Sequence, residues 1–115
     1  MTPHLHGTRI MLADDHAVVR LGLRLLLEGA GAIVVGEAES GESASRMYGP
    51  LDPDVLVMDI SMPGIGGLGA LERILIHSPK ARVLMLSAHS DDIMPTRALR
   101  AGARGYLCKR ADPEE

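Results

Sequence analysis

The chain has 115 residues, which fits one domain, and a hydrophobic content of 46% with only 2% aromatic residues predicts a core of aliphatic side chains. Its net charge of −3 and the lack of any Lys/Arg run argue against a domain that binds nucleic acid by itself. No stretch approaches the roughly 18 apolar residues of a membrane span, and the polar segment 1–7 and the single cysteine Cys108 predict a cytoplasmic protein without secretion signal or disulfide.

Strand-like and helix-like patterns alternate along the chain. The predicted elements are a strand at 10–13, a helix at 17–28, a strand at 33–35, a helix at 40–48, a strand at 55–58, a helix at 68–77, a strand at 83–86, a helix at 91–101 and a strand at 106–108. Most of the strand runs are continuously apolar, which is typical of strands buried on both faces of a parallel sheet. The alternation therefore predicts an α/β fold, a doubly wound parallel sheet of five strands with helices on both faces.

Several residues define where the helices begin and end and how they are patterned. Arg20 and Arg24 lie on one polar stripe of the first helix, which we expect to stop at Gly29. We expect the second helix to be closed by Gly49-Pro50 and the Asp52-Pro53 turn. The regular part of the fourth helix is expected to start near Pro95, because proline cannot donate to the helical ladder.

The last residues, 112–115, are typical of the cap and first turn of a further helix. We therefore expect the final helix to be truncated, with one sheet face under-covered, and the chain to be a fragment of a longer protein. We assign residues 1–115 to one domain, of which residues 1–7 are expected to be disordered.

Polar side chains follow the predicted strands at their carboxyl ends. Asp14 and Asp15 follow the first strand, Asp59 the third, Ser87 the fourth and Lys109 the fifth. In an open α/β sheet, ligands bind beyond this edge. Any one of these residues alone is better explained as a helix cap, but their collection at one edge favours a site.

Three carboxylates at this edge would repel one another. At about 4 Å and an effective dielectric near 20, each pair of like charges costs about 4 kcal/mol, which a cation or protonation relieves. Hard oxygen ligands favour Mg²⁺ or Mn²⁺ over Zn²⁺. An aspartate, a cation, the Lys109 amine and the Ser87 hydroxyl are sufficient parts for phosphoryl transfer to a carboxylate.

Four sequence motifs together resemble the receiver domain of bacterial two-component response regulators. They are Leu12-Ala-Asp-Asp-His16, Met58-Asp-Ile-Ser-Met-Pro63 with Gly67 beyond, Leu86-Ser-Ala88, and the run from Ala101 to Lys109. The resemblance covers residues 8–115. Within the family, the sequence is similar to the NarL/FixJ class and, in that class, to regulators of hexose-phosphate uptake. It implies a flavodoxin-like strand order of 2-1-3-4-5.

The resemblance implies a role for each acidic position. Asp59 would be the phospho-acceptor, receiving its phosphoryl group from a sensor histidine kinase. Asp15 would bind Mg²⁺ (or Mn²⁺) directly, with Asp14 helping directly or through water and Asp59 also a ligand. The backbone carbonyl of Ser61 would complete the protein's share of the metal shell.

The same resemblance implies how the phosphoryl group is held. Lys109 and Ser87, with the backbone amides of Ser61 and Ala88, would contact its oxygens. Ser87 and Tyr106 would form a switch, in which Ser87 moves toward the phosphoryl group and Tyr106 turns inward behind it.

The family's signalling role implies further partners. The output surface would be the fourth helix, the fifth strand and a fifth helix, and a second copy of the chain could bind on phosphorylation. DNA would be bound only through a C-terminal helix-turn-helix domain absent from this chain. The chain would change only itself, by self-phosphorylation and autodephosphorylation, and would not be an enzyme acting on other molecules.

The sequence departs from the family pattern at three places. Extra glycines follow Pro63, and we expect them to loosen that loop. Pro95 is unusual in the fourth helix. Arg110 stands where many receivers have proline after Lys109, and a cis bond there would cost about 2.5–4 kcal/mol.

Alternative functions remain open at this point. A pseudo-receiver would bind partners through the same surface without being phosphorylated. A phosphohydrolase with an aspartyl nucleophile would need a second acid two residues after Asp14, where the chain has His16. The G-x-G-x-x-G match at 64–69 is a weak dinucleotide signal, because it does not follow the first strand.

Overall fold

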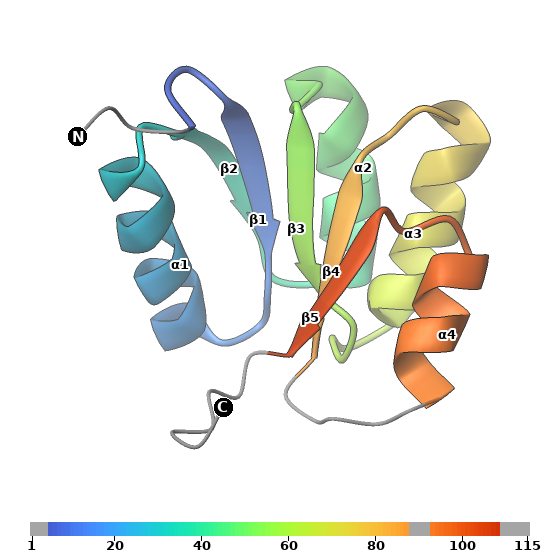
Figure 1. The fold of residues 1–115 in the computed structure, drawn as a ribbon. Coiled ribbons are helices and arrows are strands. Elements are labelled where there is room, and N and C mark those ends of the chain that lie inside the picture. Colours follow the sequence, from blue (N-terminus) through green and yellow to red (C-terminus); the bar gives the residue numbers. More distant parts are fainter. Residues whose placement is uncertain (1–4, 88–92, 109–115) are drawn as a thin grey trace.

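The computed structural model describes residues 5–87 and 93–108, and its elements alternate between strand and helix (Figure 1). They are β1 (Arg9–Ala13), α1 (Ala17–Gly29), β2 (Ile33–Ala38), α2 (Gly41–Leu51), β3 (Val55–Asp59), α3 (Gly66–His77), β4 (Val83–Ser87), α4 (Ile93–Arg100) and β5 (Gly105–Cys108). This order confirms the predicted alternation. The expected final helix from residue 112 onward falls outside the described residues.

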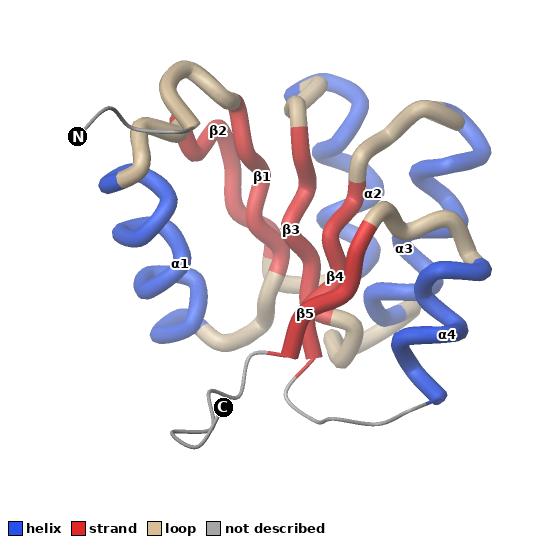
Figure 2. The backbone as a smooth tube through the Cα atoms, in the orientation of Figure 1, coloured by secondary structure: helices blue, strands red, loops and turns tan. Residues whose placement is uncertain are grey.

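The strands form one parallel sheet in the order β2-β1-β3-β4-β5, as the family resemblance implied (Figure 2). β1 and β3, which are far apart in sequence, are neighbours in the sheet. Their register pairs Ala13 with Met58, so the residues that follow, Asp14 and Asp59, come level at the carboxyl edge. This register brings the first and third strand ends together.

The helices divide between the two faces of the sheet, with α1 on one face and α2, α3 and α4 on the other (Figures 1 and 2). Because successive strand residues point to opposite faces, Met11 belongs to the core under α2–α4 while Leu12 belongs to the core under α1. Both are fully buried. The described sheet is therefore covered on both sides, which explains its continuously apolar strands.

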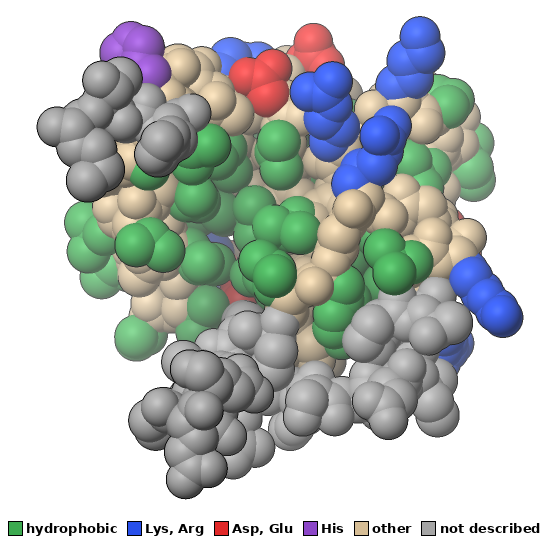
Figure 3. All heavy atoms as spheres, viewed as in Figure 1, with side chains coloured by type: hydrophobic (Ala, Val, Ile, Leu, Met, Phe, Trp, Pro, Cys, Tyr) green, Lys and Arg blue, Asp and Glu red, His purple; other side chains and the backbone are tan. Residues whose placement is uncertain are grey.

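Among the described residues, α1 is the only helix on its face of the sheet. Leu107, which lies on this face in β5, is 54% exposed. Figure 3 shows hydrophobic side chains gathered on the side of the molecule that α1 and β5 present to the viewer. Among the described residues, this face of the sheet is therefore less covered than the opposite one.

Helix boundaries differ from the predictions at three elements. α2 was expected to end at Tyr48, closed by Gly49-Pro50 and the Asp52-Pro53 turn. The helix continues instead to Leu51, with Pro50 in its last turn, and ends at Asp52. Proline at this place removes one late hydrogen bond, and the helix ends when Asp52 adopts a left-handed φ of 46° and donates its amide to the Tyr48 carbonyl.

α3 begins two residues earlier than predicted, at Gly66, and α4 ends one residue before the predicted end, at Arg100. Residues 91 and 92 of the predicted fourth helix lie outside the described residues. Pro95 is the third residue of α4. The amides of a helix's first turn have no intrahelical partner, so proline is tolerated there. Within the described residues, no helix combines the length and the apolar character that crossing a bilayer requires.

Candidate functional site

Four side chains converge at the carboxyl edge of the sheet, where β1 and β3 end. Each of Asp14, Asp15, His16 and Asp59 offers one ligand atom, and these atoms all lie within 4.8 Å of one another. Asp14 and Asp59 are each 1% exposed, whereas Asp15 and His16 are exposed. The structure therefore brings the three predicted carboxylates together in a site that is buried on one side and open on the other.

Backbone amides next to the carboxylates help to orient them. The Ser61 amide donates to Asp59 Oδ1 at 3.2 Å, and the His16 amide donates to Asp14 Oδ1 at 2.8 Å. Amides that point at a carboxylate stabilise its charged form. Asp14 and Asp59 thus each receive a donor from the residue two positions further along the chain.

His16 is a member of this cluster that sequence reasoning did not include. It is the N-cap residue of α1, and its Nδ1 lies 3.1 Å from Asp14 Oδ1 and 3.2 Å from Asp15 Oδ1. We expected it only to begin the first helix. The available signal was its place directly after two acids at a strand end, since a cap residue there is turned back toward the strand.

The other predicted site residues are placed only in part. Ser87 ends β4 and is 3% exposed, one residue beyond the Asp59–Leu86 pair of the sheet register. Lys109, Ala88 and Arg110 lie outside the described residues.

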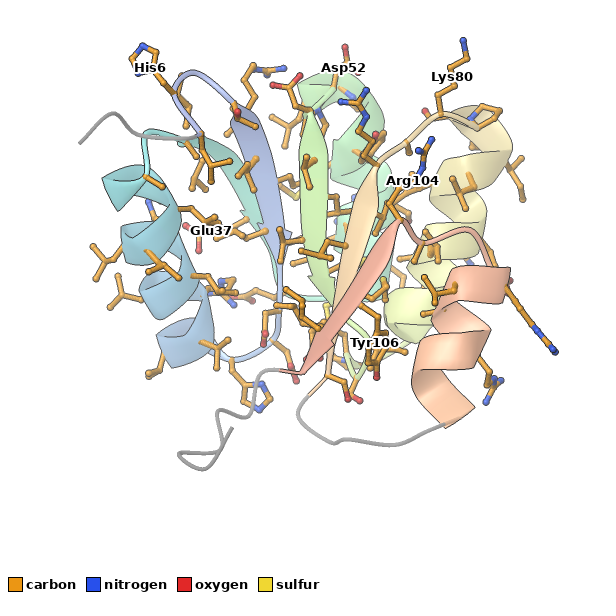
Figure 4. The ribbon with its side chains drawn as sticks, in the orientation of Figure 1. His6, Glu37, Asp52, Lys80, Arg104 and Tyr106 are labelled. Atoms are coloured by element: carbon orange, nitrogen blue, oxygen red, sulfur yellow. The ribbon has the colours of Figure 1, made fainter. Side chains whose placement is uncertain are left out.

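Tyr106 lies in β5 on the side of the sheet that carries α4 (Figure 4). Its ring packs against the core under α2–α4, and its hydroxyl is buried with no hydrogen-bond partner among the described residues. A buried tyrosine hydroxyl usually has a partner. An inward-facing hydroxyl is therefore present at the position to which the resemblance assigns a switch.

The glycine-rich loop between β3 and α3 packs closely on its surroundings. Gly64 has a φ of 74°, and a Cβ there would overlap the carboxylate of Glu42. A Cβ on Gly67 would overlap the backbone carbonyl of Asp59. Glu42, in the first turn of α2, accepts from the Ile65 amide at 3.3 Å. At Gly64 and Gly67 the absence of a side chain permits close contact with Glu42 and with the Asp59 carbonyl. These contacts do not support the expectation that the glycines loosen the loop.

A network of charged side chains joins α1 to the end of β2. Arg20 Nε donates to Glu37 Oε1 at 3.1 Å, and Arg24 Nη1 donates to Glu37 Oε2 at 2.7 Å. The Arg24 pKa is raised, first by this hydrogen bond and then by the negative charge of Glu28. Figure 4 shows Glu37 between α1 and the sheet. Glu37, for which the sequence indicated no clear role, is the shared partner of two arginines.

The acidic cluster could hold a metal ion. Its carboxylates repel one another, and two of them are buried, where the repulsion is least screened. Carboxylate oxygens are the ligands that hard divalent cations prefer. The donor set therefore fits such a cation, with the His16 imidazole as an additional neighbour.

Comparison with known proteins decides which family has this arrangement. The model of the family described as "Response regulator receiver domain" matches residues 10–115. This chain belongs to the response regulator receiver family. The receiver domain is also 44% identical over 107 residues to the response regulator UvrY of Escherichia coli K12, a match that covers 92% of this chain and 49% of UvrY.

Two further matches agree with this assignment. The receiver domain is 42% identical over 108 residues to the response regulator GacA of Pseudomonas aeruginosa, covering 93% of this chain and 50% of GacA. A crystal structure of a LuxR-family two-component response regulator from Aurantimonas sp. SI85-9A1 is 42% identical, with a TM-score of 0.88, and the match covers 95% of this chain and 79% of that chain. The receiver domain thus spans about half the length of the curated relatives it matches.

These matches confirm the family expected from the sequence motifs. The finer resemblance to regulators of hexose-phosphate uptake is compatible with them. The roles of individual site residues in this receiver domain stay predictions.

Proposed function

We propose that this receiver domain accepts a phosphoryl group on Asp59 from a sensor histidine kinase. The observation that carries the proposal is the convergence of Asp14, Asp15 and Asp59 at one sheet edge, with ligand atoms within 4.8 Å of one another. An Asp59 carboxylate oxygen forms the new bond to phosphorus, while the bond from phosphorus to the donor's histidine nitrogen breaks.

The acids hold the cation that this transfer needs. Asp15 binds Mg²⁺ directly, Asp14 directly or through water, and Asp59 and the Ser61 carbonyl complete the protein ligands. When bound, Mg²⁺ (or Mn²⁺) neutralises the negative charge of the carboxylates and of the phosphoryl oxygens. The burial of Asp14 and Asp59 supports this role, because buried carboxylates are costly without a cation beside them.

The remaining site residues contact the phosphoryl group. The Lys109 amine and the Ser87 hydroxyl hold its oxygens, together with the amides of Ser61 and Ala88. The Ser61 amide already points at the Asp59 carboxylate, which supports its share of this role. Ser87 and Tyr106 form the switch: Ser87 moves toward the phosphoryl group, and Tyr106 turns inward behind it, to the side on which its ring packs against the core.

Signalling then depends on surfaces beyond the site. The proposed partners are the sensor kinase and a second copy of the chain, which binds on phosphorylation. DNA is a partner only through a separate helix-turn-helix domain. The domain catalyses only its own phosphorylation and dephosphorylation. We infer a cytoplasmic location from this kinase partnership.

Incubation with acetyl phosphate and Mg²⁺ tests the proposal. Intact-mass measurement should show one added phosphoryl group on the wild type and none on Asp59→Asn. The matched control is Glu72→Gln, which changes an exposed acid of α3 and should be phosphorylated like the wild type. Beryllofluoride should form a complex with the wild type only in the presence of Mg²⁺.

Two other outcomes would replace the proposal. A wild type that neither gains the adduct nor binds Mg²⁺ would be a pseudo-receiver that recognises partners without phosphorylation. Multiple turnovers of an added phosphate ester would indicate a phosphohydrolase, because a receiver domain modifies only itself.

A further inference from the structure

Arg20 links the acidic site to a network outside it. Its Nη1 donates to the backbone carbonyl of Asp14 at 2.5 Å, while its Nε donates to Glu37 at 3.1 Å and its Nη2 to Glu39 at 3.3 Å. Its side chain is only 12% exposed. One guanidinium therefore joins α1, the end of β2 and the peptide between Asp14 and Asp15.

The contact with the Asp14 carbonyl matters because of where that peptide lies. The Asp14 amide donates to the Ala38 carbonyl at 3.0 Å, so β2 holds one side of Asp14. Arg20 holds the other side, and its own amide donates to the His16 carbonyl at 3.0 Å, which anchors it to the first turn of α1. The turn that carries Asp14 and Asp15 is thus held from both ends.

The positive charge of Arg20 is compensated by two glutamates that lie outside the acidic cluster. Glu37 and Glu39 accept from its guanidinium, and Glu37 and Glu28 balance Arg24 in the same way. The Arg20 group contacts the site through a neutral carbonyl. It can therefore orient the turn while adding little repulsion toward a bound divalent cation.

We propose that Arg20 is a positioning residue that sets the geometry of Asp14 and Asp15 for cation binding. This inference rests on the proposed function, because it assumes that the acids bind Mg²⁺. Groups that orient metal ligands without touching the metal commonly change metal affinity by 10- to 100-fold when removed. Lysine is not equivalent, because its single nitrogen cannot reach the three acceptors that Nε, Nη1 and Nη2 of the guanidinium contact separately.

Cation affinity of the unphosphorylated chain tests the inference. We would titrate wild type, Arg20→Ala, Arg20→Lys and Arg24→Ala with Mg²⁺ by calorimetry and with Mn²⁺ by electron paramagnetic resonance. Arg20→Ala should weaken binding about tenfold and Arg20→Lys about threefold or more.

Arg24→Ala is the matched control. It removes the same charge from the same helix face and breaks a hydrogen bond to the same Glu37, but it leaves the Asp14 carbonyl bond in place. Its cation affinity should stay within about twofold of the wild type. Urea unfolding of each variant shows whether it is folded during the titration, and if Arg20→Ala is not, Arg20→Lys decides the outcome.

The possible failures are distinguishable. A wild type that binds neither ion overturns the proposed function and the inference with it. A wild type that binds Mg²⁺ while both Arg20 variants bind as tightly as Arg24→Ala overturns the inference alone. Equal losses in all three variants would indicate general charge or stability effects and would also overturn it.

Discussion

At the scale of single residues, burial changes the ionisation of Tyr48. Tyr48 in α2 is 6% exposed, and its pKa is raised, first by burial and then by the negative charge of Asp52. Both causes disfavour the tyrosinate anion. The folded state therefore holds the Tyr48 proton at alkaline pH more tightly than the unfolded chain does.

This raised pKa predicts a loss of stability at alkaline pH. The contribution of Tyr48 is fully present below its unfolded pKa, which is about 10, and it is lost as pH rises through the higher folded value. Urea unfolding at neutral pH and above pH 10 should show a larger loss for wild type than for Tyr48→Phe. Asp52→Asn should reduce the loss only in part, and equal losses in wild type and Tyr48→Phe would contradict the assignment.

At the scale of elements, α2 contacts the loop that runs from Asp59, at the end of β3, to α3. Ser40 caps α2 by accepting from the Ser43 amide at 3.1 Å, and Ser43 Oγ accepts from the Ser40 amide in return. Glu42 then holds the loop before α3 through the Ile65 amide. The cap at the start of α2 therefore also holds Glu42 in place against the loop between Asp59 and α3.

Substituting two helical glycines, Gly67 and Gly22, would distinguish the effect of close packing on stability from the effect of helix propensity. A Cβ on Gly67 would overlap the carbonyl of Asp59 and the Cα of Ile60, whereas one on Gly22 in α1 would meet nothing within 4 Å. Gly67→Ala should lower the free energy of unfolding by about 1–3 kcal/mol. Gly22→Ala should raise it by about 0.5–1 kcal/mol. Chemical denaturation measures both, and similar effects for the two would show that the loop yields easily.

At the scale of the whole molecule, the sheet register brings like charges together. The pairing of β1 with β3 places the buried carboxylates of Asp14 and Asp59 level with each other beside Asp15. Their repulsion opposes folding, and a bound cation reverses it. The free energy of unfolding of the whole domain should therefore depend on divalent cations.

Asp59→Asn should be more stable than wild type in buffer without divalent cations, by about 1 kcal/mol, because one of three repelling charges is gone. Mg²⁺ at 100 times its dissociation constant should stabilise wild type by about 2.7 kcal/mol, and Asp59→Asn by much less. Thermal unfolding with and without Mg²⁺ measures both differences. A wild type unaffected by Mg²⁺ would contradict this account of the cluster.

The sequence by itself determined the order of elements, the parallel sheet, the family and the three acids of the site. Strands buried on both faces must be continuously apolar, and polar residues at their ends collect at one edge, so local patterns carry this information. The acids Asp14, Asp15 and Asp59 were found in this way. The last residue of α2, Leu51, was not found in this way, because the helix accommodates Pro50 in its last turn and ends only at the Asp52 cap.

Only the tertiary structure decided how the edge is assembled. Arg20 and Glu37 are 17 residues apart in the chain, and no local period connects them. Their contacts depend on β2 lying beside β1 and on the rotation of α1 over both strands. A side chain's partners across the fold are set by packing, which the one-dimensional pattern does not contain.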